Sequence, residues 1–347
     1  MKIAQIAPLV ESVPPRLYGG TERVVFHLTE ELVRLGHEVT LFATADSRTS
    51  ARLVAGAPRA TRLDPRSPDP LPYHLAMLER VRAHAAEFDV LHFHLELLHL
   101  PLFRPFVRKT VTTLHGRLDV PGLDEIYHLF DDMPLVSISH AQRRPLRVAN
   151  WLATVHHGLP PPAVAPAALP EPGYLVFLGR VSPEKGLERA IEVARRARMR
   201  LRIAAKVDRA DEAYWKSRIV PLLGDPWIEY LGEVSEADKP ALLGNAAALL
   251  FPIDWPEPFG LVMIEAMAFG TPVIAWAAGS VPEVIEPGVT GLVVRSVDEA
   301  LAALRGLPRI DRAVVRRRFT ERFSAARMAR DYLAAYAALA IKTREAA

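Results

Sequence analysis

Short apolar runs alternate with longer amphipathic segments along most of the chain. Lys2–Ala7 has the pattern of a buried strand, and Glu22–Gly36 after it places Val25, Leu28 and Leu32 at helical spacing. The first half also contains a predicted helix over Tyr73–Glu87 and predicted strands over Glu38–Ala43, Val90–Phe93, Thr110–Leu114 and Leu135–Ile138. This alternation predicts a parallel sheet covered by helices on both faces.

A proline-rich segment, Gly158–Pro172, interrupts the alternation. Prolines at this density suit neither a helix nor a central strand, so we interpret the segment as a stiff connector. The alternation then restarts. The predicted strands are Tyr174–Leu178, Arg200–Ala205, Ile228–Leu231, Ala248–Pro252, Pro272–Trp276 and Gly291–Val294, and the predicted helices are Gly186–Ala197, Lys239–Ala246, Gly260–Phe269 and Phe323–Ala340. The sequence therefore predicts an α/β protein with two doubly wound halves, whose ligands are expected at the carboxyl ends of the strands.

Composition narrows the functional classes. The 347 residues are enough for two domains. The net charge is +3 and acidic residues are spread among the basic ones, so the charge pattern does not indicate nucleic-acid binding. The absence of cysteine fits a reducing compartment, no apolar stretch is long enough to span a membrane, and Met1–Val10 is too short for a signal peptide. We therefore expect a cytoplasmic protein. The basic run Arg312–Arg318 is interpreted as a solvated helix face, with attachment to a membrane surface as the alternative.

The strongest chemical signal is Pro256–Ala266, which contains two glutamates eight residues apart. Glu257 stands in a proline-braced loop and Glu265 on the predicted helix that follows. Gly260 lets the backbone approach a ligand closely, and the free amides of the helix start attract an anion such as phosphate. Because carboxylates accept hydrogen bonds from hydroxyls, Glu265 suits a ribose and Glu257 a sugar. An ordinary surface loop followed by a helical glutamate is the alternative interpretation.

Two further loops carry weaker signals. Gly179–Gly186 follows a predicted strand, and its Arg180 and Lys185 suit a diphosphate leaving group, although a solvated turn is the alternative. Tyr18–Glu22 lies between the first strand and the first helix, where Gly19 and Gly20 would allow close approach of a phosphate. It is not the dinucleotide fingerprint, because G-x-G-x-x-G is absent.

Several histidines invite a metal interpretation. His92 and His94 lie two apart on a predicted strand and His99 follows soon after. Such a pair could bind zinc, but no third ligand stands at a matching spacing, and plain cleft or core histidines are the alternative. Ser137, Ser139 and His140 do not form a hydrolase elbow, because G-x-S-x-G is missing.

Together these motifs resemble the retaining glycosyltransferases of family 4, which have the GT-B fold. The likeness rests on Gly179-Arg180 with Pro183–Gly186, Glu257–Gly260 with Glu265, Gly270–Ile274, Gly279–Glu283 and Gly288–Gly291. It covers nearly the whole chain. It implies an acceptor-binding Rossmann-like domain over residues 1–158, a linker over 159–172, a nucleotide-sugar-binding domain over 173–322 and a helix over 323–347 that returns to the first domain. The two domains are expected to face a central cleft.

The resemblance also implies residue roles. Arg180 and Lys185 match the pair that holds the donor diphosphate. Glu257 matches the carboxylate that touches the transferred sugar, and His115 the histidine beside that sugar. Glu265 matches the ribose ligand. The other expected donor-binding residues are Gly19, Gly20, Ser139, Glu233, Val234, Phe259, Gly260 and Leu261. Lys206 stands where relatives often carry glycine, and is either an added phosphate or base contact or a surface lysine. The connector begins His156-His157-Gly158, where Asn-Gly is common.

The implied activity is that of a hexosyltransferase. It would move a sugar from a UDP- or GDP-sugar to a carbohydrate or small-molecule acceptor, with retention of configuration and with neither metal nor cofactor. Front-face attack, in which the departing phosphate takes the acceptor proton, is the mechanism that the resemblance suggests. Two alternatives stay open: a sugar-nucleotide epimerase or hydrolase of the same fold, and a sugar-nucleotide-binding protein without activity.

Overall fold

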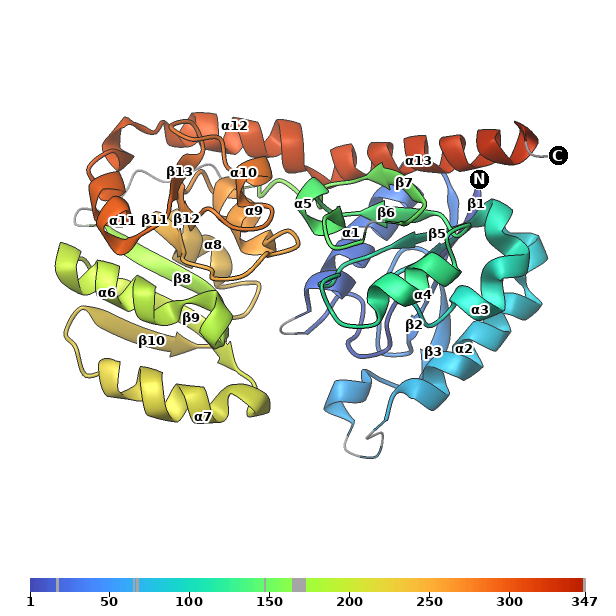
Figure 1. Cartoon of the computed structure of the whole chain (residues 1–347), viewed down its shortest axis with the longest axis horizontal. Coiled ribbons are helices and arrows are strands. Elements are labelled where there is room, and N and C mark those ends of the chain that lie inside the picture. The colour runs from blue at the N-terminus through green and yellow to red at the C-terminus, as the bar shows by residue number, and fades with distance from the viewer. Residues whose placement is uncertain (17–18, 65, 67–68, 147, 164–172, 346–347) are drawn as a thin grey trace. The chain divides into compact units, whose positions relative to one another are not determined.

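The structure is a computed structural model that describes residues 1–16, 19–64, 66, 69–146, 148–163 and 173–345 (Figure 1). The chain divides into two compact units. Unit 1 consists of Met1–Pro160 with Ala325–Ala347, and unit 2 of Pro161–Ser324. Most of the predicted linker, residues 164–172, lies outside the described residues.

Unit 1 is built on a sheet of seven parallel strands in the order β3-β2-β1-β4-β5-β6-β7. The strands are β1 (Lys2–Ile6), β2 (Glu38–Thr44), β3 (Arg52–Ala57), β4 (Val90–Phe93), β5 (Thr110–Thr113), β6 (Leu135–Ser137) and β7 (Trp151–Thr154). Central strands such as β4 are buried along their whole length, because helices cover both faces of a parallel sheet.

In the part of unit 1 that the structure describes, the α-helices are α1 (Gly20–Arg34), α2 (Leu71–Ala83), α3 (Leu100–Phe103), α4 (Leu123–Leu129), α5 (His140–Arg143) and α13 (Ala325–Glu345). The apolar stripe of α1, which includes Val25, Leu28 and Leu32, is fully buried as its spacing predicted. The C-terminal helix α13 contacts α1 and β7, so the end of the chain packs on unit 1 (Figure 1).

Unit 2 is built on six parallel strands in the order β10-β9-β8-β11-β12-β13. The strands are β8 (Tyr174–Val181), β9 (Leu201–Val207), β10 (Ile228–Gly232), β11 (Ala246–Phe251), β12 (Val273–Trp276) and β13 (Gly291–Val294). The helices are α6 (Leu187–Ala197), α7 (Glu212–Tyr214), α8 (Lys239–Gly244), α9 (Leu261–Ala268), α10 (Val281–Val284), α11 (Val297–Leu304) and α12 (Arg312–Phe323). The core of the unit joins α6 to the sheet through Leu187, Ile191, Leu175 and Ile203.

The predicted pattern of two doubly wound parallel sheets is confirmed, with differences of detail, among them the helices α4 and α11, which were not predicted. The edge strands β3 and β7 were not predicted. The predicted helix Phe323–Ala340 is wrong at its start, because Phe323 ends α12 and Ser324 is extended (φ −73°, ψ 148°) before α13 begins at Ala325. The helical conformation is thus interrupted at Ser324, and α12 belongs to unit 2.

The basic run of α12 is also different from its prediction as a solvated face. Arg312 donates to the carbonyl oxygens of Gly244 and Ala246 at 2.6 and 2.8 Å. Arg318 and Arg322 form ion pairs with Glu286. The run therefore ties α12 to unit 2. Within the described residues, none of the helices combines the length and apolar character needed to cross a membrane.

Candidate functional site

The strand order of unit 2 reverses between β8 and β11. β9 and β10 lie on one side of β8, whereas β12 and β13 lie beyond β11. Open α/β sheets bind ligands at such a switch point, outside the carboxyl ends of the strands. Both principal sequence motifs follow these two strands: Arg180 lies near the end of β8 with Lys185 just after it, and Glu257 lies in the loop after β11.

Lys185 and Glu257 form an ion pair across this switch point. Lys185 Nζ donates to Glu257 Oε2, and the same oxygen accepts a hydrogen bond from Trp255 Nε1 at 2.9 Å. The ammonium lies 4.7 Å from the centroid of the Trp255 ring. Only 15% of the Lys185 side chain and 11% of the Glu257 side chain are exposed. This partial burial strengthens the attraction between the two charges and any interaction that either makes with a charged ligand.

The loop that carries Glu257 is held by its backbone. Ser280 N donates to Glu257 O at 3.0 Å, and Ser280 Oγ donates to Phe259 O at 2.8 Å. Gly279 adopts a positive φ of 52°, and a Cβ atom there would lie 2.3 Å from Glu257 O. Only glycine fits this contact, so Gly279 sets the position of the Glu257 backbone.

The N-terminus of α9 has no side-chain cap. Its cap residue Gly260 is left-handed (φ 77°, ψ 65°) and provides no side chain to accept a hydrogen bond from the first amides. Unpaired amides and the helix dipole attract negative charge at such an end. Phe259 is 2% exposed and anchors the turn in the core. Phe259, Gly260 and Leu261 thus stand together at a helix start, as the sequence predicted.

Glu265 lies one turn further along α9 and is also paired. It is 6% exposed, and its Oε1 accepts from Lys239 Nζ at 2.9 Å. Lys239 opens α8, is 9% exposed and also donates to Glu236. No sequence pattern indicated this contact, because a lysine at the start of an amphipathic helix is normally solvated.

The other predicted cations of unit 2 have acidic partners as well. Arg180 donates to Glu184 Oε1 at 2.5 Å and to Asp211 Oδ2 at 3.2 Å. Lys206 Nζ lies 2.7 Å from Asp208 Oδ1 at the end of β9. Like Lys185 and Lys239, these two cations are thus bound to carboxylates. An anionic ligand would therefore compete with protein carboxylates for these cations.

Two predicted residues follow β10. Glu233 is exposed and Val234 is half-buried, just after the left-handed Gly232 (φ 74°). They lie at the carboxyl edge of the same sheet, beside the strand that carries Lys206. The structure therefore gathers the unit 2 residues of the predicted site along one sheet edge.

In unit 1 the glycine pair lies at the start of α1. Gly19 is the N-cap residue and Gly20 the first helical residue, whereas Tyr18 lies outside the described residues. The next carboxylate, Glu22, is buried beside Glu11, and burial raises the pKa of Glu22 to about 7. Strand order in this unit reverses between β1 and β4, so the glycine pair follows a strand at a second switch point.

His115 follows β5 in unit 1. Its backbone N–H donates to Glu96 Oε1 at 2.8 Å, and its ring stacks on His157 with centroids 5.2 Å apart. Burial lowers the pKa of His115 to about 3, so the ring is neutral. Glu96, a non-glycine residue with a φ of 53°, was missed by the sequence reasoning, because a single glutamate in a loop carries no pattern. Ser139 is buried, and its Oγ accepts from Gln142 N as the cap of α5.

The zinc alternative for the neighbouring histidines lacks support in the structure. His92 makes hydrogen bonds to Tyr336 and Thr113 through both ring nitrogens, and His94 does the same with Gln5 and His115. A histidine ligand needs one free nitrogen for the metal. Among the residues that the structure describes, no group of three potential ligands could hold a metal ion.

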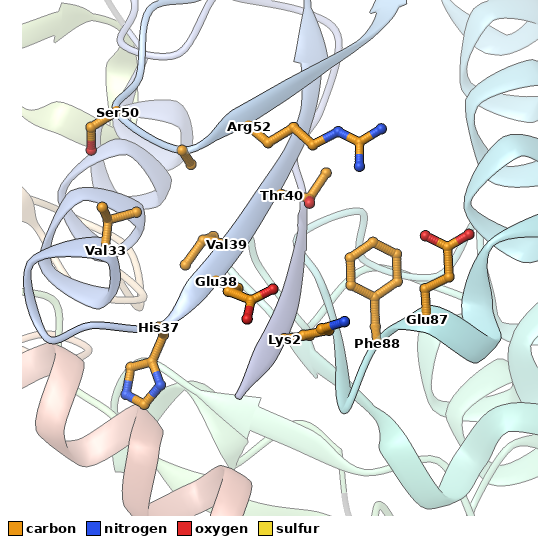
Figure 2. A pocket seen from close by; sticks show the side chains of 11 residues that line it. Lys2, Val33, His37, Glu38, Val39, Thr40, Ser50, Arg52, Glu87 and Phe88 are labelled. Carbon is orange, nitrogen blue, oxygen red and sulfur yellow. The ribbon is translucent and has the colours of Figure 1, made fainter.

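A surface pocket of about 490 Å³ lies elsewhere in unit 1 (Figure 2). Its lining comes from the amino-terminal ends of β1, β2 and β3, opposite to the edge that carries His115 and the glycine pair. Lys2 and Arg52 provide positive charge there, and Glu38 and Glu87 negative charge. Its mixed charge and its place at the amino ends of the strands separate it from the predicted site.

Family models match each half of the chain. The model described as Glycosyltransferase Family 4 matches residues 18–159, and the model described as Glycosyl transferases group 1 matches residues 165–307. The second match contains Arg180, Lys185, Glu257 and Glu265.

Similar proteins agree with these matches. The chain is 30% identical over 348 residues to a phosphatidyl-myo-inositol mannosyltransferase of Mycolicibacterium smegmatis, covering 88% of this chain and 84% of the relative. It is also 30% identical over 137 residues to O-antigen chain mannosyltransferase B of Escherichia coli. This shorter match covers 35% of that relative.

Solved structures resemble the whole chain. AviGT4, a glycosyltransferase involved in avilamycin A biosynthesis, has a TM-score of 0.75 and 26% identity, with 98% of both chains covered. HepE of Anabaena, solved with UDP and glucose, has a TM-score of 0.73 and 18% identity, with 96% of this chain and 98% of HepE covered.

Proposed function

The chain belongs to glycosyltransferase family 4, and from this premise we propose that it transfers a hexose from a UDP- or GDP-sugar to a carbohydrate or small-molecule acceptor. Its two parallel-sheet units and its structural relatives confirm the GT-B fold, and glycosyl transfer is the activity of its named relatives. The proposal adds the donor class, retention of configuration, independence of metal and the roles of individual residues.

One observation carries the donor proposal: a lysine and a glutamate are paired at the switch point of unit 2, beside a helix start that lacks a side-chain cap. A nucleoside diphosphate carries the charge that suits Lys185, Arg180 and the α9 amides. An ammonium group has three N–H donors, so Lys185 can keep Glu257 and still bind phosphate oxygens. The UDP complexes of HepE support a nucleotide donor of this kind.

The proposed reaction breaks the bond between the anomeric carbon and the phosphate oxygen. The acceptor hydroxyl attacks the same face of the sugar, and its proton passes to the departing phosphate oxygen, so configuration is retained. Arg180, Lys185 and the α9 amides stabilise the charge that develops on the diphosphate. These groups take the part that a metal ion would otherwise have, and no protein nucleophile is required.

The two glutamates orient the donor. Glu257, fixed by Lys185, Trp255 and Gly279, accepts hydrogen bonds from sugar hydroxyls. Glu265 accepts them from the ribose, while Lys239 binds its Oε1. Lys239 thereby balances the charge of a buried carboxylate, which would be costly to bury alone. Unit 1 provides the acceptor side and His115. A cytoplasmic location stays a prediction that rests on the cysteine-free sequence.

The test is transfer by purified variants with a panel of UDP- and GDP-sugars. One preorganised donor to a developing charge is worth about 3–4 kcal/mol. We therefore expect Arg180→Ala and Lys185→Ala each to lower kcat by about two to three orders of magnitude. Release of nucleoside diphosphate and formation of the glycoside are measured together, with and without EDTA, and the anomeric configuration of the product is read by NMR.

Lys216→Ala is the matched control. This lysine is 71% exposed and pairs with Glu212 on the surface of the same unit, so its loss should leave kcat unchanged. Wild-type kcat in Lys185→Ala, loss of activity in EDTA, or an inverted product would each contradict a part of the proposal. Nucleotide-sugar hydrolysis that is not accelerated by any acceptor would favour a hydrolase.

A further inference from the structure

A chain of buried hydrogen bonds in unit 1 joins the C-terminal helix to His115. Tyr336 of α13 accepts a hydrogen bond from Gln5 Nε2 on β1 at 3.1 Å. Gln5 Oε1 lies 2.8 Å from His94 Nε2, and His94 Nδ1 lies 2.8 Å from His115 Nε2. We call Tyr336, Gln5 and His94 the relay. Its three members are at most 2% exposed, so water does not compete for these contacts.

The relay has a direction. Gln5 Oε1 can only accept, so His94 Nε2 must carry the proton. Burial lowers the pKa of His94 well below its usual value, and the neutral ring then has a bare Nδ1. His115 must therefore donate to it through Nε2–H. Because His115 is itself neutral, its own Nδ1 is left with a lone pair.

At the far end of the relay, the Tyr336 hydroxyl makes a further hydrogen bond, to His92. Tyr336 Oη lies 2.7 Å from His92 Nδ1, and His92 Nε2 lies 2.7 Å from Thr113 Oγ1. Since Tyr336 accepts from Gln5, its single proton is available to His92. With the Gln5 amide nitrogen facing it, the Tyr336 hydroxyl thus accepts from Gln5 and donates to His92. The opposite orientation of the Gln5 amide would reverse every proton in the relay and make His115 Nδ1 a donor.

The chain of hydrogen bonds ends at His115 Nδ1. It is buried, and it has no hydrogen-bond partner among the described residues. Three contacts position His115. His94 bonds to Nε2 of its ring, His157 stacks on the ring face, and Glu96 accepts from its backbone N–H. An unmet buried acceptor is costly, so a ligand that supplies a hydrogen-bond donor to it gains affinity.

We propose that Tyr336, Gln5 and His94 are positioning residues that hold His115 as its Nε2–H tautomer, so that Nδ1 accepts a hydrogen bond from a hydroxyl of the transferred sugar. The inference rests on the proposed function for the identity of the hydroxyl, but not for the relay itself. It gives α13 a direct connection to the site, and it makes the site selective for a sugar that carries a hydroxyl donor at this point.

The tautomer can be read without any substrate. The full chain is labelled with nitrogen-15 in its histidines, and long-range proton–nitrogen correlation spectra are recorded at neutral pH. We expect a pyridine-type Nδ1 and a pyrrole-type Nε2 for His115, assigned from His115→Gln. Tyr336→Phe keeps the ring but frees the Gln5 amide to turn over, so both tautomers should appear. A pyrrole-type Nδ1 in the wild type, or no change in Tyr336→Phe, overturns the proposal.

Kinetics test the consequence for the sugar. Deoxy and deoxyfluoro donors are compared with the parent at each ring position, because fluorine cannot donate a hydrogen bond. At one position we expect both analogues to lower kcat/KM by about tenfold in the wild type, as for one hydrogen bond. That sensitivity should disappear in Tyr336→Phe. Equal sensitivity in this variant contradicts the relay, and sensitivity to the deoxy donor alone indicates that His115 donates.

Two histidine substitutions separate positioning from folding. His94→Gln keeps one donor and one acceptor and should retain the sensitivity, whereas His94→Phe should lose it. His99→Gln is the matched control, since His99 is equally buried but bonds to Thr112 outside the relay. If no sugar nucleotide is used at all, the spectra still decide the tautomer, and only the source of the hydroxyl is rejected.

Discussion

Single buried residues of unit 1 have their charge state set by their surroundings. Glu22 is the plainest case: it is 6% exposed at the start of α1, and burial raises its pKa from 4.5 to about 7. The nearby charge of Glu11 raises it further, while Arg62 lowers it. A carboxyl group with a raised pKa in the folded state binds its proton more tightly there than in the unfolded chain.

Glu22 therefore makes stability depend on pH. Between pH 4.5 and 7 the unfolded chain loses this proton first, so the free energy of unfolding falls as pH rises. The shift corresponds to about 3 kcal/mol, present below pH 4.5 and lost above pH 7. Glu22→Gln cannot ionise, so we expect it to exceed the wild type in stability by up to that amount at pH 8 and by little at pH 5, measured by urea unfolding.

Glu125→Gln serves as the comparison, because Glu125 is an exposed carboxylate on α4 of the same unit. It should change stability by less than about 0.5 kcal/mol at either pH. The wild type also contains buried neutral histidines, so the difference between Glu22→Gln and wild type is the relevant quantity. A difference that does not grow between pH 5 and 8 would show that Glu22 is ionised in the folded protein.

Sequence reasoning at this scale found residue types but not their partners. The spacing of Glu257 and Glu265 and their place around a helix start are local, and they were predicted. Lys185 binds Glu257 across 72 residues, and Lys239 binds Glu265 across 26. Such pairs depend on which loops the strand order brings together, and no local sequence pattern encodes the strand order. The roles of the site residues stay predictions until the variants are measured.

At the scale of elements, α12 is tied to its unit by a half-buried arginine. Arg312 sits at its first position and donates to the carbonyls of Gly244, Ala246 and Phe269 and to Thr271 Oγ1. Burial lowers the pKa of its guanidinium. Arg312→Ala would leave Gly244 O and Ala246 O without this donor, so we expect unit 2 to lose about 2–4 kcal/mol of stability. Denaturant unfolding followed by circular dichroism measures the loss.

Arg317→Ala is the control from the same helix. Its side chain is 62% exposed and lies 4.0 Å from Glu321, a distance at which a surface pair contributes about 0–1 kcal/mol. Equal effects of the two substitutions would mean that the contacts of Arg312 do not stabilise α12, and that the run is a solvated face after all.

The elements that were predicted are those with strong periodicity or continuous burial. β1, β4 and α1 were found because their apolar positions repeat with the spacing of one structure type. β3 and β7 were missed because edge strands are only partly buried, and all four residues of β7 are half-buried. The interruption of the helix at Ser324 was missed because apolar residues lie on both sides of it, at the end of α12 and the start of α13.

At the scale of the whole molecule, each unit has its own sheet and its own switch point, and the proposed function assigns them different parts. In that proposal the nucleotide binds unit 2, where Arg180, Lys185, Glu257 and Glu265 lie. The proposed sugar contact, His115, is in unit 1 and is joined by the relay to α13. A nucleoside diphosphate and a complete nucleotide sugar should therefore leave different traces along the chain.

Hydrogen exchange followed by mass spectrometry can separate these traces. We expect UDP or GDP to slow exchange in segments 179–186 and 256–266, because a bound diphosphate would hold the loop amides and the start of α9. The matching nucleotide sugar should extend protection to residues 113–116, where its hydroxyl reaches His115. Segment 90–93 is a buried central strand and provides the unchanged reference.

Protection of unit 1 alone by UDP and GDP would assign the nucleotide site to unit 1. The pair of Lys185 and Glu257 would then have a role in stability and not in donor binding. Protection of 113–116 by the diphosphate alone would instead place a phosphate, and not the sugar, beside His115.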